Sequence, residues 1–120
     1  MDVDHPRLMQ RKVEVIKANQ PLLDVLPNFA TSNLPSGILG RSEQYVAVAC
    51  DLKQVSHLDR TLRQLFDLDA PSVAILFVTE VSLAYMERHT ADAVLKWAAR
   101  FRDGKVWRMS HRLRKPLTVT

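Results

Sequence analysis

The sequence predicts an α/β domain built on part of a doubly wound parallel sheet, and two observations carry that prediction. Two uninterrupted apolar runs, residues 45–50 and 73–78, are typical of strands buried on both faces. Stretches with helical spacing precede, separate and follow these runs, which is the helix–strand alternation of βαβ units. The length of 120 residues suits one domain at most.

The first helix is predicted to begin at Pro6, where the missing N–H of proline costs nothing. Apolar residues then recur at three- and four-residue spacing through Ile16. We expect Pro21 to end this helix, because proline cannot donate the next backbone hydrogen bond. Residues 20–42 are rich in proline and glycine and predict a loop-rich connection, with a short helical turn at residues 22–26.

Two later stretches return to helical spacing. Residues 55–66 carry an apolar stripe, and Asp59 and Arg63 are i,i+4 partners on its other side. A further helix is predicted over residues 90–101, with Thr90 as its N-cap. These helices would cover the sheet formed by the two apolar strands.

The charge of the chain is unevenly distributed. The net charge is +4, but six of the 17 basic residues and one of the 13 acidic residues lie in residues 102–120. Residues 1–101 therefore carry −1 and the last 19 residues carry +5. We interpret residues 102–120 as a divergent basic C-terminal tail, solvated as such ends usually are. The alternative is a small RNA-binding module that contacts phosphates through this tail.

The single cysteine and the lengths of the apolar runs limit which metal sites, disulfides and membrane segments the sequence can contain. The single cysteine excludes an internal disulfide, and no Cys and His residues have zinc-ligand spacing. The longest apolar runs are too short to cross a bilayer, and no signal peptide follows Met1. The sequence thus predicts a cytoplasmic protein without a metal ion or a membrane partner. Cys50 ends a predicted strand and is expected to be a small core residue.

Carboxylates stand at the ends of the predicted strands. Asp51 follows residues 45–50, Glu80 follows residues 73–78, and Asp4 lies where an earlier strand would end. In such sheets ligands bind beyond the carboxyl ends of the strands. Carboxylates there suit a ligand with ribose hydroxyls, an adenine amine and a cationic amine, all of which donate hydrogen bonds. The alternative is that Asp4 and Asp51 merely cap helices.

Three segments resemble motifs of the leucine carboxyl methyltransferase family, in the correct order. They are residues 2–6 with the following Arg11-Lys12 (DVDHP…RK), residues 45–53 (YVAVACDLK) and residues 79–86 (TEVSLAYM). The resemblance extends from about residue 2 to residue 101. Within the family, the wording of the third segment and the stretch after it are closer to the fungal tRNA wybutosine-synthesizing methyltransferases.

The resemblance implies a Rossmann-like fold that binds S-adenosylmethionine, and it implies roles for individual residues. Asp4 would bind the ribose hydroxyls, while Asp51 and Leu52 would hold the adenine. Glu80 would lie near the methionine part of the cofactor. Tyr85 stands where the family places an active-site aromatic and is the candidate catalytic residue. No nucleophile of the enzyme is required, because the sulfonium is already activated.

The two branches of the family imply different substrates. The wybutosine branch methylates, and then methoxycarbonylates, a hypermodified guanosine side chain of phenylalanine tRNA. The other branch methylates the C-terminal leucine carboxylate of a protein phosphatase catalytic subunit. Phenylalanine tRNA is the predicted partner, and the phosphatase subunit is the alternative.

The chain also departs from the family pattern. Gly37, Gly40 and Gly104 form no G-x-G motif, so the family's first strand and glycine loop are predicted to be missing. Residues 102–120 do not match the family either, which leaves residues 1–101 as the central part of a methyltransferase domain. A third interpretation is therefore a truncated, non-enzymatic product. Open sheet edges would make such a chain marginally stable or prone to aggregation.

Overall fold

The computed structural model describes residues 1–79 and 82–101. The chain divides into two compact units, Met1–Phe66 and Asp67–Thr120, here called the N-terminal unit and the C-terminal unit. Each unit is described by itself.

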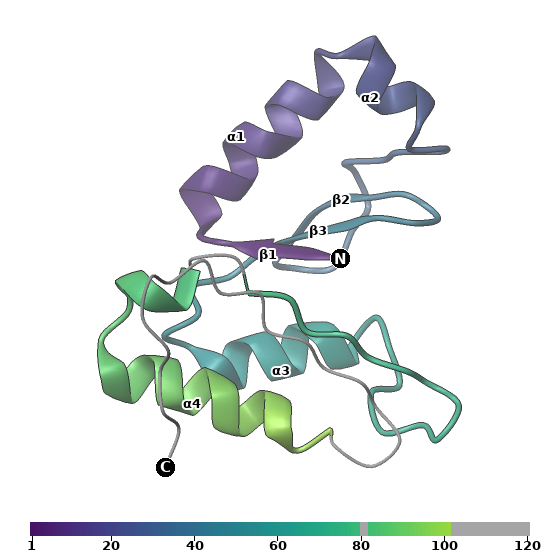
Figure 1. Cartoon of the computed structure of the whole chain (residues 1–120). Helices are drawn as coiled ribbons and strands as arrows, with labels where there is room; N and C mark the ends of the chain where they lie inside the picture. Colours follow the sequence, from purple (N-terminus) through teal and green to yellow (C-terminus); the bar gives the residue numbers. More distant parts are fainter. Residues whose placement is uncertain (80–81, 102–120) are drawn as a thin grey trace. The chain divides into compact units, whose positions relative to one another are not determined.

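The N-terminal unit is built on a three-stranded mixed sheet with the order β1-β3-β2. Its strands are β1 (Asp2–Asp4), β2 (Ile38–Arg41) and β3 (Val46–Ala49). β1 runs parallel to β3, with Asp4 opposite Ala49, whereas β2 runs antiparallel on the other side of β3. Both edges of β3 are therefore occupied, and Figure 1 shows the three strands side by side.

Helix α1 (Pro6–Lys17) supplies the apolar layer above this sheet. Met9 is 0% exposed and packs with Val13 and Ala47 in an apolar cluster. Partly buried residues of the sheet and of the connecting loop surround this cluster. Pro6 opens the helix as predicted, but α1 ends at Lys17 without the help of Pro21. Pro21 instead lies in the first turn of α2 (Gln20–Asp24), where the side chain of Asn19 accepts a hydrogen bond from the Leu22 N–H.

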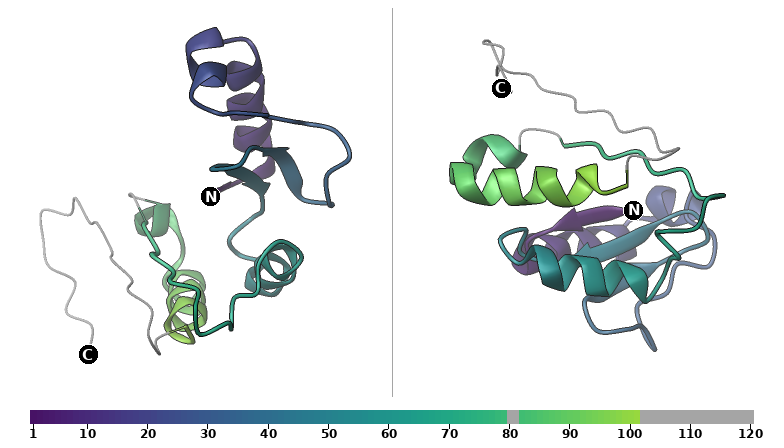
Figure 2. Two further views of the ribbon diagram at one scale, coloured as in Figure 1. Left: turned by 90° about the vertical axis from the view of Figure 1, so that its right-hand side faces the viewer. Right: turned by 90° about the horizontal axis from the view of Figure 1, so that it is seen from below.

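Helix α3 (Val55–Arg63) lies on the side of the sheet away from α1, as Figures 1 and 2 both show. Its predicted ion pair is confirmed, because Arg63 Nε lies 2.7 Å from Asp59 Oδ2. The sheet thus has a helix on each side, as in doubly wound folds.

A tight loop joins β2 to β3. The buried Ser42 accepts hydrogen bonds at its Oγ from the Gln44 and Tyr45 N–H groups and closes the turn. Gly40 lies against the ring of Phe29, so close that a Cβ atom there would stand 2.5 Å from Phe29 Cζ. The backbone of β2 can approach that ring only because position 40 lacks a side chain.

The C-terminal unit contains a short 3₁₀ helix, η1 (Ser82–Tyr85), and α4 (Arg88–Ala99). Three aromatic rings form its core. Trp97 meets Phe77 and Phe101 edge-to-face, each at a centroid distance of 5.4 Å. Such pairs add to the stability that area burial alone provides.

Three predictions about the elements are wrong. The sheet is mixed and not parallel, because β2 forms within the stretch that was expected to be a loop. Residues 73–78 form no β-ladder with any described residue. The predicted N-cap of the last helix, Thr90, lies inside α4, where it is 8% exposed.

Residues 73–78 cannot form a ladder with β3. β3 already pairs with β1 on one side and with β2 on the other, so it has no free edge for them. Leu76 and Val78 are accordingly 56% and 63% exposed, far from the complete burial that their apolar character predicted.

No helix among the described residues is both long enough and apolar enough to cross a membrane.

Candidate functional site

Asp4 and Asp51 both stand at the carboxyl ends of strands, at the same edge of the sheet. β1 and β3 are parallel neighbours, so their carboxyl ends lie side by side. The backbone N–H of Cys50 donates to the carbonyl oxygen of Asp4 over 2.9 Å. Asp51 therefore follows directly on a residue that is hydrogen-bonded to Asp4. We call Asp4, Asp51 and Leu52 the carboxyl edge.

The Asp4 carboxylate is held at both of its oxygens. Oδ1 accepts a 2.8 Å hydrogen bond from the His5 N–H, and Oδ2 lies 2.8 Å from Lys12 Nζ. Burial alone would raise the pKa of Asp4, but the hydrogen bonds from Lys12 and His5 outweigh it and lower that pKa below its ordinary value. The side chain is therefore an ionised acceptor at neutral pH.

Asp51 and Leu52 form a turn directly after β3. Asp51 Oδ1 accepts a 3.0 Å hydrogen bond from the Lys53 N–H, and both side chains are partly exposed. The interpretation of Asp4 and Asp51 as helix caps is wrong, because the N-cap positions of α1 and α3 belong to His5 and Gln54. The two carboxylates are thus not explained by helix capping.

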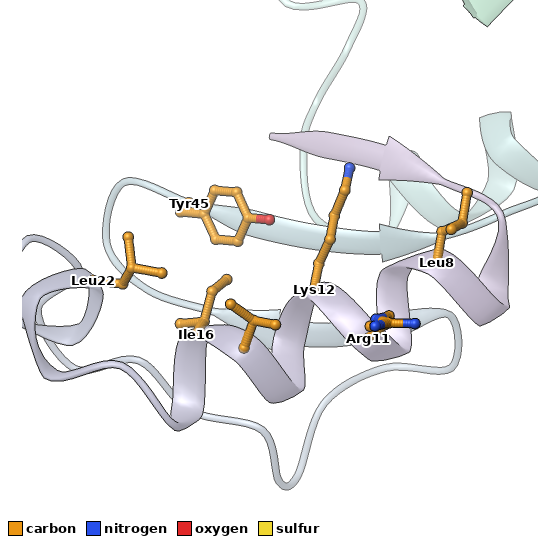
Figure 3. A pocket seen from close by; sticks show the side chains of 7 residues that line it. Leu8, Arg11, Lys12, Ile16, Leu22 and Tyr45 are labelled. Carbon is orange, nitrogen blue, oxygen red and sulfur yellow. The ribbon is translucent and has the colours of Figure 1, made fainter.

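Lys12 joins Asp4 to a second carboxylate. Its Nζ lies 3.1 Å from Asp2 Oδ2, and the Tyr45 hydroxyl donates to the same oxygen over 3.3 Å. Figure 3 shows Lys12 extending from α1 towards β1 beside Tyr45. This cluster was not predicted. The i,i+2 spacing of Asp2 and Asp4, which puts both side chains on one face of a strand, was the available signal.

The other two predicted site residues, Glu80 and Tyr85, follow residue 66 and so do not belong to the N-terminal unit. Glu80 lies outside the described residues. Tyr85 belongs to the C-terminal unit, ends η1 and is 86% exposed. The roles of both residues remain predictions.

Cys50 is a core residue, as expected. Its side chain is 2% exposed. Burial, and secondarily the charge of Asp51, raise the pKa of the thiol. A protonated, buried thiol is a poor nucleophile. Within residues 1–79 and 82–101, no three His, Cys, Asp or Glu side chains are grouped so that they could hold a metal ion.

The N-terminal unit also has an apolar groove of about 330 Å³ along α1. Its lining residues are Leu8, Arg11, Lys12, Val15, Ile16, Leu22 and Tyr45. Figure 3 shows these side chains, which come from α1, from α2 and, for Tyr45, from the position directly before β3. Asp4 and Asp51 do not line the groove, but Lys12, which does, contacts the Asp4 carboxylate.

The fold and the carboxyl edge define an α/β protein that is compatible with part of a methyltransferase fold. A profile of the family described as leucine carboxyl methyltransferase matches residues 1–99, and the chain belongs to this family. Among curated proteins, it is similar to tRNA wybutosine-synthesizing protein 4 of several fungi.

The similarity covers most of this chain but little of the relatives. The protein of Emericella nidulans is 39% identical over 100 residues, which are 83% of this chain and 9% of the relative. The protein of Aspergillus fumigatus is 38% identical over 86% of this chain and 10% of its own length. That of Neurospora crassa is 42% identical over 59% of this chain and 6% of its own length. The chain thus spans about a tenth or less of these relatives.

Proposed function

We propose that this chain is part of an S-adenosylmethionine-dependent methyltransferase that acts on phenylalanine tRNA in wybutosine synthesis. The observation that carries the proposal is that Asp4 ends β1 and Asp51 follows β3, so both stand at the carboxyl ends of two neighbouring parallel strands. Family membership and the names of the fungal relatives support it. We further propose a cytoplasmic location.

The residues at the carboxyl edge fit this cofactor chemically. The ribose and adenine of the cofactor donate hydrogen bonds, and an ionised carboxylate accepts up to four. Asp4 uses one position for His5 and one for Lys12, and Asp51 uses one for Lys53. Both carboxylates therefore keep acceptor capacity. Asp4 would hold the ribose, and Asp51 with Leu52 would hold the adenine.

The cofactor supplies an activated methyl group, and the residues of this chain position it. Glu80 would face the ammonium group of the methionine part, and Tyr85 would line the reaction site. We propose residues 1–101 as the central part of the methyltransferase domain and residues 102–120 as a separate basic tail. The first strand and glycine loop of a doubly wound sheet would lie beyond β1.

Calorimetric titration of the full chain with S-adenosylmethionine tests the proposal. Asp51→Ala and Glu80→Ala should each weaken binding about tenfold or more, because each removes a charge-assisted hydrogen bond. Asp24→Ala is the matched control, since Asp24 is an exposed carboxylate on α2 outside the carboxyl edge. Absence of binding by the unmodified chain would refute the proposal for this chain and favour a non-enzymatic product.

A second candidate substrate is the C-terminal leucine carboxylate of a protein phosphatase catalytic subunit. The description of the matching family favours it. The Emericella nidulans relative should be assayed with phenylalanine tRNA and with a peptide that ends in the phosphatase sequence. Methyl transfer to the tRNA alone supports the wybutosine proposal, and transfer to the peptide alone would replace it with this second one.

A further inference from the structure

We propose that Lys12 is a positioning residue for cofactor binding, which fixes the Asp4 carboxylate through an ion-pair cluster anchored by Asp2 and Tyr45. The inference rests on the proposed function, because it assigns Lys12 to the residue that would hold the ribose. It adds a residue that itself would touch no part of the cofactor.

The cluster forms where α1 packs beside β1. Asp2 and Asp4 are two residues apart on one strand, so their side chains share a face of the sheet. Lys12 comes from α1 and reaches both carboxylates, with Nζ at 3.1 Å from Asp2 and 2.8 Å from Asp4. Figure 3 shows this side chain directed at β1, whereas the neighbouring Arg11 points elsewhere.

Lys12 limits the rotation of the Asp4 carboxylate. The His5 N–H holds Oδ1 and Lys12 holds Oδ2, so the plane of the group is set from both sides. Without Lys12, only the contact with the His5 N–H would remain to hold this carboxylate among residues 1–79 and 82–101. Two carboxylates on one strand face would then repel each other, and Asp4 would turn towards solvent.

Asp2 and Tyr45 in turn hold Lys12. Asp2 Oδ2 receives both Lys12 Nζ and the Tyr45 hydroxyl, the latter at 3.3 Å. The Tyr45 ring is half-buried and lies 6.4 Å from the Phe29 ring, centroid to centroid. The cluster therefore connects the packed interior of the N-terminal unit to the carboxyl edge.

A purely structural role would be a poor explanation of this cluster. Its charged groups are partly exposed, and exposed ion pairs contribute only about 0–1 kcal/mol to the free energy of unfolding. Loss of Lys12 should thus change cofactor affinity far more than it changes the stability of the chain. That difference makes the two roles separable.

The test compares Lys12→Met, Lys12→Arg and the matched control Arg11→Met in the full chain. Arg11 is exposed, next in sequence and without an ion-pair partner among the described residues, so its substitution removes the same charge. Lys12→Met should weaken S-adenosylmethionine binding about tenfold, and Arg11→Met should leave it within about twofold. Lys12→Arg should restore most of the affinity, because it retains the cation.

Titration of the Asp4 carboxyl by carbon-13 NMR without cofactor gives a second readout. The pKa of Asp4 should rise in Lys12→Met and stay unchanged in Arg11→Met, and the acid limb of the affinity–pH profile should move to higher pH with it. If Lys12→Met does not fold, Asp2→Asn replaces it. That variant keeps both Asp4 and Lys12 and should still weaken binding by loss of the anchor.

Equal binding by Lys12→Met and the unmodified chain, or an equal loss in Arg11→Met, would overturn the inference alone. An unchanged Asp4 titration in Lys12→Met would do the same. Failure of the unmodified chain to bind cofactor would overturn the proposed function, and this inference with it.

Discussion

Gly40 lets β2 pack against the Phe29 ring, because it has no side chain. The position faces the Phe29 ring, and a Cβ atom would lie 2.5 Å from Cζ and 2.8 Å from Cε2 of that ring. These distances are below normal contact, so either the ring or the backbone of β2 must move when a side chain is added.

We expect Gly40→Ala to lower the free energy of unfolding by about 1–3 kcal/mol, the usual cost of overpacking. Urea denaturation followed by circular dichroism measures the effect. The double variant Phe29→Leu with Gly40→Ala should recover part of the loss, because the smaller side chain makes room. Simple additivity of the two substitutions would contradict the proposed contact.

At the same scale, the sequence predicted which carboxylates stand at the carboxyl edge but not what holds them. Asp4 and Asp51 could be placed because an apolar run ends or a helix begins beside each of them. The contact between Lys12 and Asp2 spans ten positions and depends on how α1 packs on β1. No local pattern contains that packing, and this is why the cluster was missed.

Helix α1 separates a core face from an exposed groove face. Met9 is 0% exposed and central to the apolar cluster, whereas the adjacent Leu8 is 55% exposed and lines the groove. Two neighbouring residues of similar size thus have opposite environments.

Met9→Ala should therefore cost about 2–5 kcal/mol of unfolding free energy, because it leaves a cavity in the core. Leu8→Ala should change that free energy by less than about 0.5 kcal/mol. Thermal and urea denaturation of both variants check this pair. Similar losses in the two would mean that α1 does not bury the face described here.

Strand β3 should be the most protected strand of the sheet. It pairs on both sides, whereas β1 pairs only with β3 among the described residues. Hydrogen-exchange mass spectrometry should show slower exchange in Val46–Ala49 than in Asp2–Asp4. Equal exchange in the two strands would indicate that β1 gains a second neighbour, for example by self-association.

At the scale of elements, long apolar patterns were predictable and short strands were not. The stripe of α1 and the run at β3 are each local, so periodicity identified them. Strand β2 is short and contains Gly40, so its sequence alone does not predict it, and the strand exists because it pairs with β3. Residues 73–78 have strong strand character but no ladder, which shows that an apolar run alone does not make a strand.

For the whole molecule, stability should fall at alkaline pH. The pKa values of Cys50 and Tyr45 are raised from 9.0 and 10.0, mainly by burial, and that of Lys12 is raised from 10.5, mainly by its hydrogen bond to Asp4. The unfolded chain loses these protons first, so the native state binds more protons and becomes less stable as the pH rises. Below those ordinary values the contribution is fully present.

Urea denaturation across the alkaline range measures this dependence. Tyr45→Phe should flatten the decline that begins near the ordinary tyrosine value of 10.0. At the acid end the sign is reversed for Asp4, whose lowered pKa contributes stability above 3.8 that is lost as the pH falls through the native value. A profile that stays flat at high pH would contradict the assigned environments.

Because β3 lies between β1 and β2, the position of β3 determines where further strands can be added to the sheet. No further strand can enter at its centre, so enlargement is confined to the outer sides of β1 and β2. The backbone of Ala30 already pairs with Arg41 of β2, so part of the outer edge of β2 is occupied. A parallel strand added beside β1 would place its own carboxyl end next to Asp4. A ligand that lies across the strand ends could then extend from Asp51 past Asp4 to the added strand.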